Sequence, residues 1–74
     1  MKDYDLFVRF KDLSGAKNIS EMAEMLEIKQ PYISQVKMGN VNLSTKVARK
    51  MWKIAGDEIS LMWGRLQEEK LKKG

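Results

Sequence analysis

Apolar residues in the first third of the chain recur at the spacing of amphipathic helices. Between residues 3 and 14 they fall at i, i+1, i+4 and i+7, at Leu6, Phe7, Phe10 and Leu13. A second set, at i, i+3, i+4 and i+7, consists of Ile19, Met22, Ala23 and Leu26. Because positions with this spacing share one face of a helix, the pattern predicts a helix over residues 3–14 and another ending near residue 26, each with one buried face.

The second of these helices has a marked beginning. Asn18 precedes it and Glu21 follows three residues later, which is the arrangement of a capping box. In such a box the asparagine side chain accepts a hydrogen bond from the backbone N–H of the glutamate. Residues 27–29 are then a short link to the next helix.

A proline marks the start of the third predicted helix. Pro31 disfavours the helical conformation at Gln30 and suits the first helical position, so we expect Gln30 at the N-cap and Pro31 at N1. Ile33 and Val36 are the buried pair expected on this helix. Gly39 ends it by adopting positive φ.

Two further helices are predicted in the second half of the chain. Ser44 is placed to cap the fourth, whose apolar stripe is Val47, Ala48, Met51 and Ala55. Gly56 ends that helix, and Asp57 or Glu58 begins the fifth. Its apolar positions are Ile59, Met62 and Leu66, after which the pattern decays and we expect the last turns to be solvated or frayed. No strand pattern occurs, so the chain is expected to form an all-α, compact five-helix bundle, a single domain over residues 1–74.

The composition argues against catalysis. The 74 residues include no cysteine and no histidine, which removes disulfides, thiol chemistry, the commonest metal ligand and the usual general base at neutral pH. We therefore expect no enzyme, cofactor, metal or small-molecule ligand. No apolar run approaches the roughly 18 residues of a membrane span, and the start MKDYDLFVRFKD is unlike a signal peptide, so we expect a cytoplasmic protein without a membrane partner.

The net charge of +4 is concentrated in one segment. Residues 41–56 carry four basic and no acidic side chains, whereas basic and acidic groups balance in the segments on either side. The four are Lys46, Arg49, Lys50 and Lys53, which form a basic stripe opposite the apolar one. This charge directly follows the third helix.

Residues 18–39 resemble the helix-turn-helix motif of the Cro and lambda-repressor (XRE-type) DNA-binding family. The matching features are a small residue at Ala23 and apolar residues at Ile28, Ile33 and Val36 before Gly39, and YISQVKMGN is the most specific stretch. The resemblance extends to about residue 62 and implies a lambda-repressor-like fold. Glu27 stands where the family usually has glycine, and Lys29 and Gln30 stand where serine or threonine usually precedes the recognition helix.

The resemblance makes the helix over about residues 30–38 a recognition helix for the major groove of double-stranded DNA. A glutamine amide donates and accepts together, which matches adenine N6 and N7, so Gln30 and Gln35 are the first candidates for base reading. Ser34 can bond to either kind of base edge, and Pro31 and Met38 can contact a thymine methyl group. The alternative is that these are ordinary solvated residues on a surface helix.

Phosphate contacts are expected beside the base-reading face. Asn18 lies where family members set a helix end against a phosphate. The other candidates are Lys29, Tyr32, Lys37, Asn40, Asn42 and Lys46.

Members of this family commonly bind two-fold sites as dimers, which implies a homodimer. Trp63 and Leu66 are assigned either to the dimer contact or to the core of the monomer. The expected function is that of a small phage-like transcriptional regulator, a repressor or Cro-like switch that occupies an operator. The alternative is a protein-interaction module on the same fold, an antitoxin or anti-repressor acting through its last helix.

Overall fold

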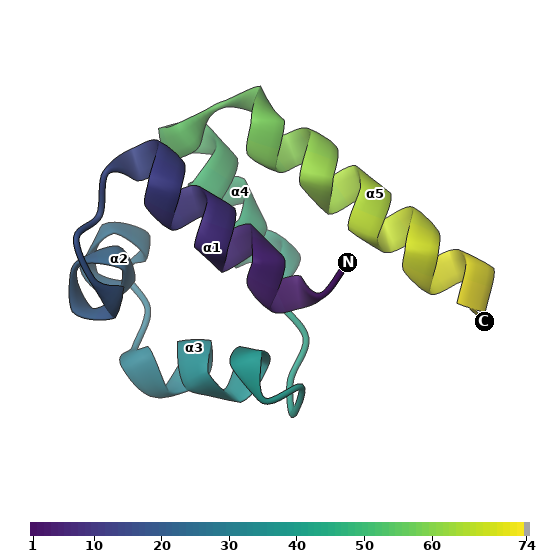
Figure 1. The fold of residues 1–74 in the computed structure, drawn as a ribbon, viewed down its shortest axis with the longest axis horizontal. Helices are drawn as coiled ribbons and strands as arrows, with labels where there is room; N and C mark the ends of the chain where they lie inside the picture. Colours follow the sequence, from purple (N-terminus) through teal and green to yellow (C-terminus); the bar gives the residue numbers. More distant parts are fainter. Residues whose placement is uncertain (74) are drawn as a thin grey trace.

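The computed structural model describes residues 1–73, and within that range the chain is all-helical, with five helices and no strand (Figure 1). The helices are α1 (Asp3–Ser14), α2 (Ile19–Leu26), α3 (Gln30–Lys37), α4 (Thr45–Ala55) and α5 (Asp57–Lys73). The coarse sequence prediction, five helices joined by short links, is therefore confirmed. None of the helices in residues 1–73 is both long and apolar enough to cross a membrane.

Side chains placed by the sequence cap two of the helices. The N–H of Glu21 donates to Oδ1 of Asn18 at 2.8 Å, and the N–H of Val47 donates to Oγ of Ser44 at 3.3 Å. Each bond satisfies one of the backbone donors that a helix leaves without a partner in its first turn. At the other end of α3, Gly39 has a φ of 80°, so its predicted positive φ is also confirmed.

One apolar cluster formed by all five helices is the core. It includes Leu6, Phe7, Phe10, Met22, Leu26, Ile33, Val36, Met51, Ile59 and Leu66, with both tryptophans packed against it and partly exposed. Leu13 and Ile19 were expected on buried faces and are exposed. They lie in the last turn of α1 and at the first residue of α2, where helical spacing continues but neighbouring helices no longer cover the face.

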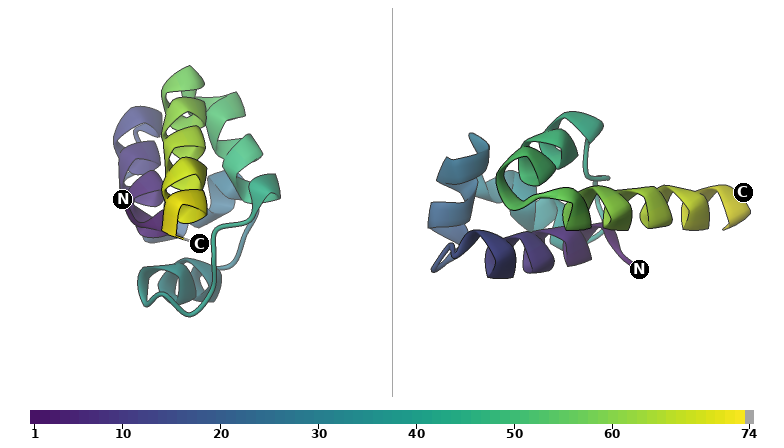
Figure 2. Two further views of the ribbon diagram at one scale, coloured as in Figure 1. Left: turned by 90° about the vertical axis from the view of Figure 1, so that its right-hand side faces the viewer. Right: turned by 90° about the horizontal axis from the view of Figure 1, so that it is seen from above.

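The last helix packs on α4 and α1 and then extends beyond the rest of the bundle (Figure 2). Leu66 lies on its covered side and is only 1 % exposed, so it is a core residue. The assignment of Leu66 to a dimer contact is therefore wrong for this structure. In contrast, Leu61 is 66 % exposed and Leu71 is 80 % exposed.

Polar contacts of α1 join it to segments that are distant in sequence. The Asp3 carboxylate, at the start of α1, accepts from the backbone N–H of Leu43 at 2.7 Å and pairs with Nζ of Lys70 at 3.0 Å. Arg9 on α1 forms an ion pair with Glu58 on α5. These contacts tie the start and the middle of α1 to α5 and hold the loop before α4.

Candidate functional site

The corner between α2 and α3 is built on a left-handed residue. Glu27 has a φ of 56° and a ψ of 42°, and it is the single non-glycine residue with positive φ in the described range. Its N–H donates to the carbonyl of Glu24 at 3.1 Å, and the N–H of Ile28 donates to the carbonyl of Ala23 at 3.0 Å. This pair of bonds is a Schellman motif, which ends α2 sharply and turns the chain into α3.

The third helix begins one residue earlier than the sequence predicted. Lys29, with a φ of −93° and a ψ of 147°, is the N-cap, so Gln30 is at N1 and Pro31 follows it. The first four N–H groups of a helix have no helical acceptor, so a proline at the second position sacrifices no hydrogen bond. The bias of proline against a helical residue before it is a preference, and here it does not decide the boundary.

The two faces of α3 are clearly separated. Ile33 and Val36 are buried against the core, as predicted. The five candidates for base reading are all exposed: Gln30, Pro31, Ser34, Gln35 and Met38. Met38 lies just after the helix as its C-cap. The structure thus presents these side chains on one short element that is anchored from behind.

A side-chain pair links two of the predicted contact residues. Nδ2 of Asn40 donates to Oε1 of Gln35 at 2.8 Å, and the backbone N–H of Asn40 donates to the carbonyl of Gln35 at 3.0 Å. A carbonyl oxygen has two lone pairs, and the amide group has two N–H donors. Gln35 therefore keeps one acceptor position and both donors while its orientation is fixed.

Tyr32 has a different role from the predicted phosphate contact. Its hydroxyl donates to the carbonyl of Asn42 at 3.3 Å and accepts from the N–H of Ser44 at 2.9 Å. Its ring meets Phe7 edge to face, with centroids 6.5 Å apart. Because a phosphate accepts hydrogen bonds and the single hydroxyl proton is already used, Tyr32 positions the loop before α4 instead.

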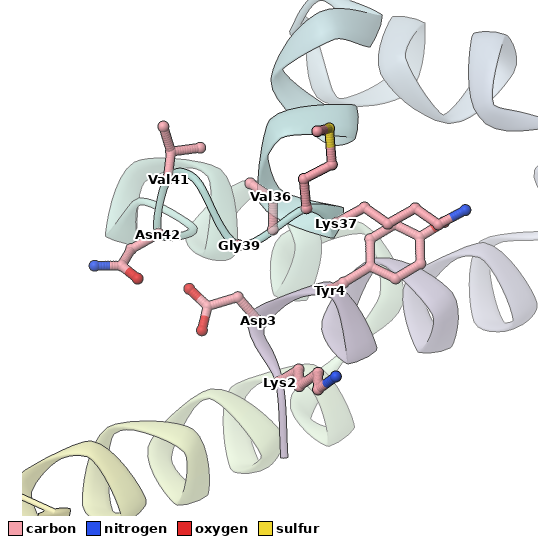
Figure 3. Close-up of a pocket in the computed structure, with 9 residues that line it drawn as sticks. Lys2, Asp3, Tyr4, Val36, Lys37, Gly39, Val41 and Asn42 are labelled. Carbon is pink, nitrogen blue, oxygen red and sulfur yellow. The ribbon is translucent and has the colours of Figure 1, made fainter.

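Lys37 turns toward the start of α1. Its Nζ lies 5.6 Å from the centre of the Tyr4 ring, within the range of a cation–π contact. Beside this pair is an open hollow of about 270 Å³, and Figure 3 shows Lys2, Asp3 and Lys37 around it. The participation of Tyr4 and Asp3 had no signal in the sequence, because both contacts join residues more than thirty positions apart.

The remaining phosphate candidates lie at exposed positions around α3. Asn18 uses Oδ1 for its cap, which leaves its Nδ2 donors available. Lys29 precedes α3, and Asn42 and Lys46 follow it in the loop and in the first turn of α4; all three are exposed. The candidates thus come from the start of α2, the start of α3 and the region after α3.

A second hollow, of about 430 Å³, lies on the outer side of α4 and is lined by Thr45, Lys46, Arg49, Lys50 and Lys53. Lys50 bends toward α2, where its Nζ donates to the carbonyl of Leu26 at 3.2 Å and lies 3.9 Å from Glu27. A lysine at a helix C-terminus is favourable because the last carbonyls carry partial negative charge. Lys50 therefore completes the end of α2, which the sequence did not indicate.

Searches among protein-family models, curated proteins and solved structures found no match to this chain. Within residues 1–73 no three carboxylates come together in a group that could hold a metal ion. The functional interpretation therefore depends on the residues around α3 and on their geometry.

Proposed function

We propose that this chain is a sequence-specific DNA-binding protein of the lambda-repressor-like helix-turn-helix type and acts as a small transcriptional regulator. The observation that carries the proposal is the arrangement of α2 and α3. Two eight-residue helices are joined by a tight turn, and the second buries Ile33 and Val36 while it presents five side chains suited to base edges. A helix held in this way fits the major groove of duplex DNA.

Base reading is assigned to the glutamines of α3. Gln35 is held by Asn40 and retains the donors and acceptor that adenine N7 and N6 require. Gln30 stands at the N-terminal end of α3, the end that enters the groove first in this kind of docking. Ser34 lies between them, and Pro31 and Met38 offer apolar contact to thymine methyl groups.

Backbone contacts are assigned to Asn18, Lys29, Asn42 and Lys46. They lie before and after α3 in the chain, as expected of groups that set the register of a recognition helix without reading sequence. Lys37, which lies beside the start of α1, is a further proposed backbone contact. Asn40 is proposed to act indirectly, by holding the side chain of Gln35.

The proposed regulator acts as a homodimer on a two-fold operator. A domain this small covers only part of a helical turn of DNA, and a two-fold dimer doubles the contact. The exposed residues Leu61 and Leu71 of α5 are the apolar groups proposed for the dimer contact, in place of Leu66. Trp63 packs against the core on another face of the helix, because residues two positions apart do not share a face. Occupancy of the operator would block polymerase and repress the promoter.

Selection from a pool of randomised duplexes tests the proposal. We expect a two-fold consensus with half-sites about one helical turn apart and about a thousandfold preference for it over random duplex. In the same assay Lys46→Ala should weaken binding to all duplexes alike and reduce the magnitude of the slope of log K against log salt by about 0.9 per protomer, or about 1.8 for the dimer. Recovery of no consensus by the wild-type protein would contradict sequence-specific binding.

The exposure of Leu61 and Leu71 also favours a second candidate, a protein-interaction module that acts through α5. This candidate predicts weak binding to DNA without sequence preference. It also predicts that the Leu61→Glu variant no longer binds its protein partner. The DNA-binding proposal instead predicts that Leu61→Glu yields a monomer by sedimentation that still prefers the half-site. The two readouts together separate the candidates.

A further inference from the structure

The outer face of α4 carries three cations in one row. Lys46, Arg49 and Lys53 stand at i, i+3 and i+7, which places them within a narrow arc of the helix. Val47, Ala48 and Met51 occupy the opposite, buried face. All three cations are exposed, and they line the hollow of about 430 Å³ described above.

These cations are not neutralised by the protein. Arg9 pairs with Glu58, Lys70 with Asp3, and Lys50 with the C-terminal end of α2. Within residues 1–73, no carboxylate lies within 4.0 Å of a side-chain nitrogen of Lys46, Arg49 or Lys53. Like charges one turn apart weaken a helix. Lys53 lies in the last turn of α4 and complements the helix dipole, whereas Lys46 and Arg49 gain nothing from it. The stability of α4 therefore does not account for the row as a whole, which contains three of the four charges in the only strongly basic segment of the chain.

The row starts beside the proposed DNA interface and leads away from it. Lys46 follows the loop after α3 directly, whereas α4 runs from there toward the opposite side of the bundle (Figures 1 and 2). With a rise of about 1.5 Å per residue, Lys53 lies about 10 Å further along the helix axis than Lys46. With α3 in the groove of a straight duplex, we expect the backbone to meet Lys46 at the start of the row, because Arg49 and Lys53 lie further along α4 and away from α3.

We propose that this cationic face is a second contact surface for the sugar–phosphate backbone, and that it takes up duplex flanking the segment read by α3. The inference rests on the proposed function. Because the row leads away from α3, the flanking duplex must curve toward α4 to reach Arg49 and Lys53. The energy of bending is offset by the additional phosphate contacts, as in other proteins that bend DNA.

A phosphate backbone suits this face better than an acidic protein does. A stable protein interface needs an apolar centre from which water is excluded, and the hollow is lined by one threonine and four cations. Binding to DNA gains free energy from release of condensed counterions, for which the charges alone suffice. The first residue of the row, Lys46, already belongs to the proposed interface with DNA, so the row continues that interface.

The test compares two charge-matched double variants on two mixed-sequence duplexes. Arg49→Gln with Lys53→Gln removes the row beyond Lys46. Arg65→Gln with Lys72→Gln removes one arginine and one lysine from exposed positions on α5. One duplex has about 12 base pairs, little more than a helical turn, and the other about 30, which adds flanks on both sides. Affinity is measured for each over a range of salt concentrations, with thermal unfolding as a check on folding.

On the long duplex, loss of two contacts in each bound protomer should reduce the magnitude of the slope of log K against log salt by about 1.8 per protomer for the α4 variant. On the short duplex its slope should equal that of the wild type, and the α5 variant should match the wild type on both. Equal slopes for the two variants on the long duplex would overturn the inference. An equal loss on both duplexes would also overturn it, because the contacts would then not depend on flanking DNA. Failure of the wild type to bind either mixed-sequence duplex would remove the backbone binding and with it the inference. The proposed function is judged separately, by whether the selection recovers a consensus.

Discussion

The side-chain amide of Asn40 donates a 2.8 Å hydrogen bond to Oε1 of Gln35, across the C-terminal end of α3. A free glutamine at an exposed helix position samples many rotamers, and ordering it on binding costs free energy. In this structure the hydrogen bond to Asn40 favours one rotamer of Gln35 in the absence of any ligand. Under the proposed function, the pair would be a pre-organised reader, in which Asn40 positions Gln35.

The first prediction concerns this pair. Gln35→Ala should weaken binding to the selected site by about 1 to 3 kcal/mol, with the preference lost at one base position. Asn40→Ala should keep the same preferred base and lose less binding free energy than Gln35→Ala. The reason is that Gln35 remains but its side chain is no longer held by Asn40. Affinities for the consensus and for its single-base variants measure both effects. If Gln35→Ala lost the same amount of affinity on every duplex, a base-reading role for Gln35 would be excluded.

The second prediction concerns the left-handed corner. An L-residue in this conformation costs about 1 to 2 kcal/mol, part of which glycine gives back through the greater freedom of its unfolded chain. Glu27→Gly should therefore raise the free energy of unfolding by about 0.5 to 1 kcal/mol. The ion pair lost with Glu27 counts for little, since that side chain is 81 % exposed.

Urea unfolding of Glu27→Gly and of Glu24→Gly provides the measurement and its control. Glu24 is exposed within α2, so glycine there should destabilise the protein by about 1 kcal/mol. Opposite signs for these two neighbouring substitutions are the expected result. A lower free energy of unfolding in both variants would show that the Glu27 side chain supports the turn.

The third prediction concerns the loop before α4. Tyr32→Phe keeps the ring against Phe7 and removes the hydroxyl that joins Asn42 and Ser44. The expected loss is about 0.5 to 1.5 kcal/mol of unfolding free energy, with faster hydrogen exchange at the Ser44 amide. Tyr4→Phe is the control, since the Tyr4 hydroxyl forms no hydrogen bond within residues 1–73. An unchanged exchange rate in Tyr32→Phe would argue against this positioning role.

The fourth prediction concerns acid. The hydrogen bond from Arg9, joined by the charge of its guanidinium, lowers the pKa of Glu58 below its ordinary value of 4.5, although partial desolvation opposes the shift. The folded protein then binds fewer protons at this site than the unfolded chain does. The stabilisation is therefore complete above pH 4.5 and is lost as the pH falls through the lower pKa of the folded state.

Urea midpoints of the wild type and of Glu58→Gln over a pH series test this prediction. The variant should be less stable than the wild type above pH 4.5, and the difference should shrink as the pH falls below that value. Glu68→Gln changes an exposed site on the same helix, and its urea midpoint should differ little from that of the wild type at every pH. A constant difference between Glu58→Gln and the wild type at every pH would show that the effect is not ionic.

Local chemistry made much of this fold predictable. The caps at Asn18 and Ser44 follow from bonds between residues three apart, and the buried pair of α3 follows from helical periodicity. The N-cap at Lys29 was missed because proline suits two neighbouring positions equally well. The burial of Leu66 was not decided by the sequence, because periodicity identifies a face of α5 without showing what covers it.

The candidate site was predictable in its residues and not in its internal bonds. The spacing of α3 placed the five base-reading candidates on its exposed side. The bonds of Tyr32 to the loop and of Lys50 to α2 appear only when distant segments fold together. For this reason Tyr32, predicted as a phosphate contact, and Lys50, a member of the basic stripe, prove to be engaged within the protein.

The Asp3 carboxylate described above is shared by the loop before α4 and by Lys70 of α5. A molecule that bound α5 and drew Lys70 away would change the acceptor available to the Leu43 N–H, and with it the loop that leads to Lys46. Thermodynamic linkage then works in both directions. Under the proposed function, whatever factor a partner on α5 imposed on the affinity for DNA, DNA would impose on the affinity for that partner.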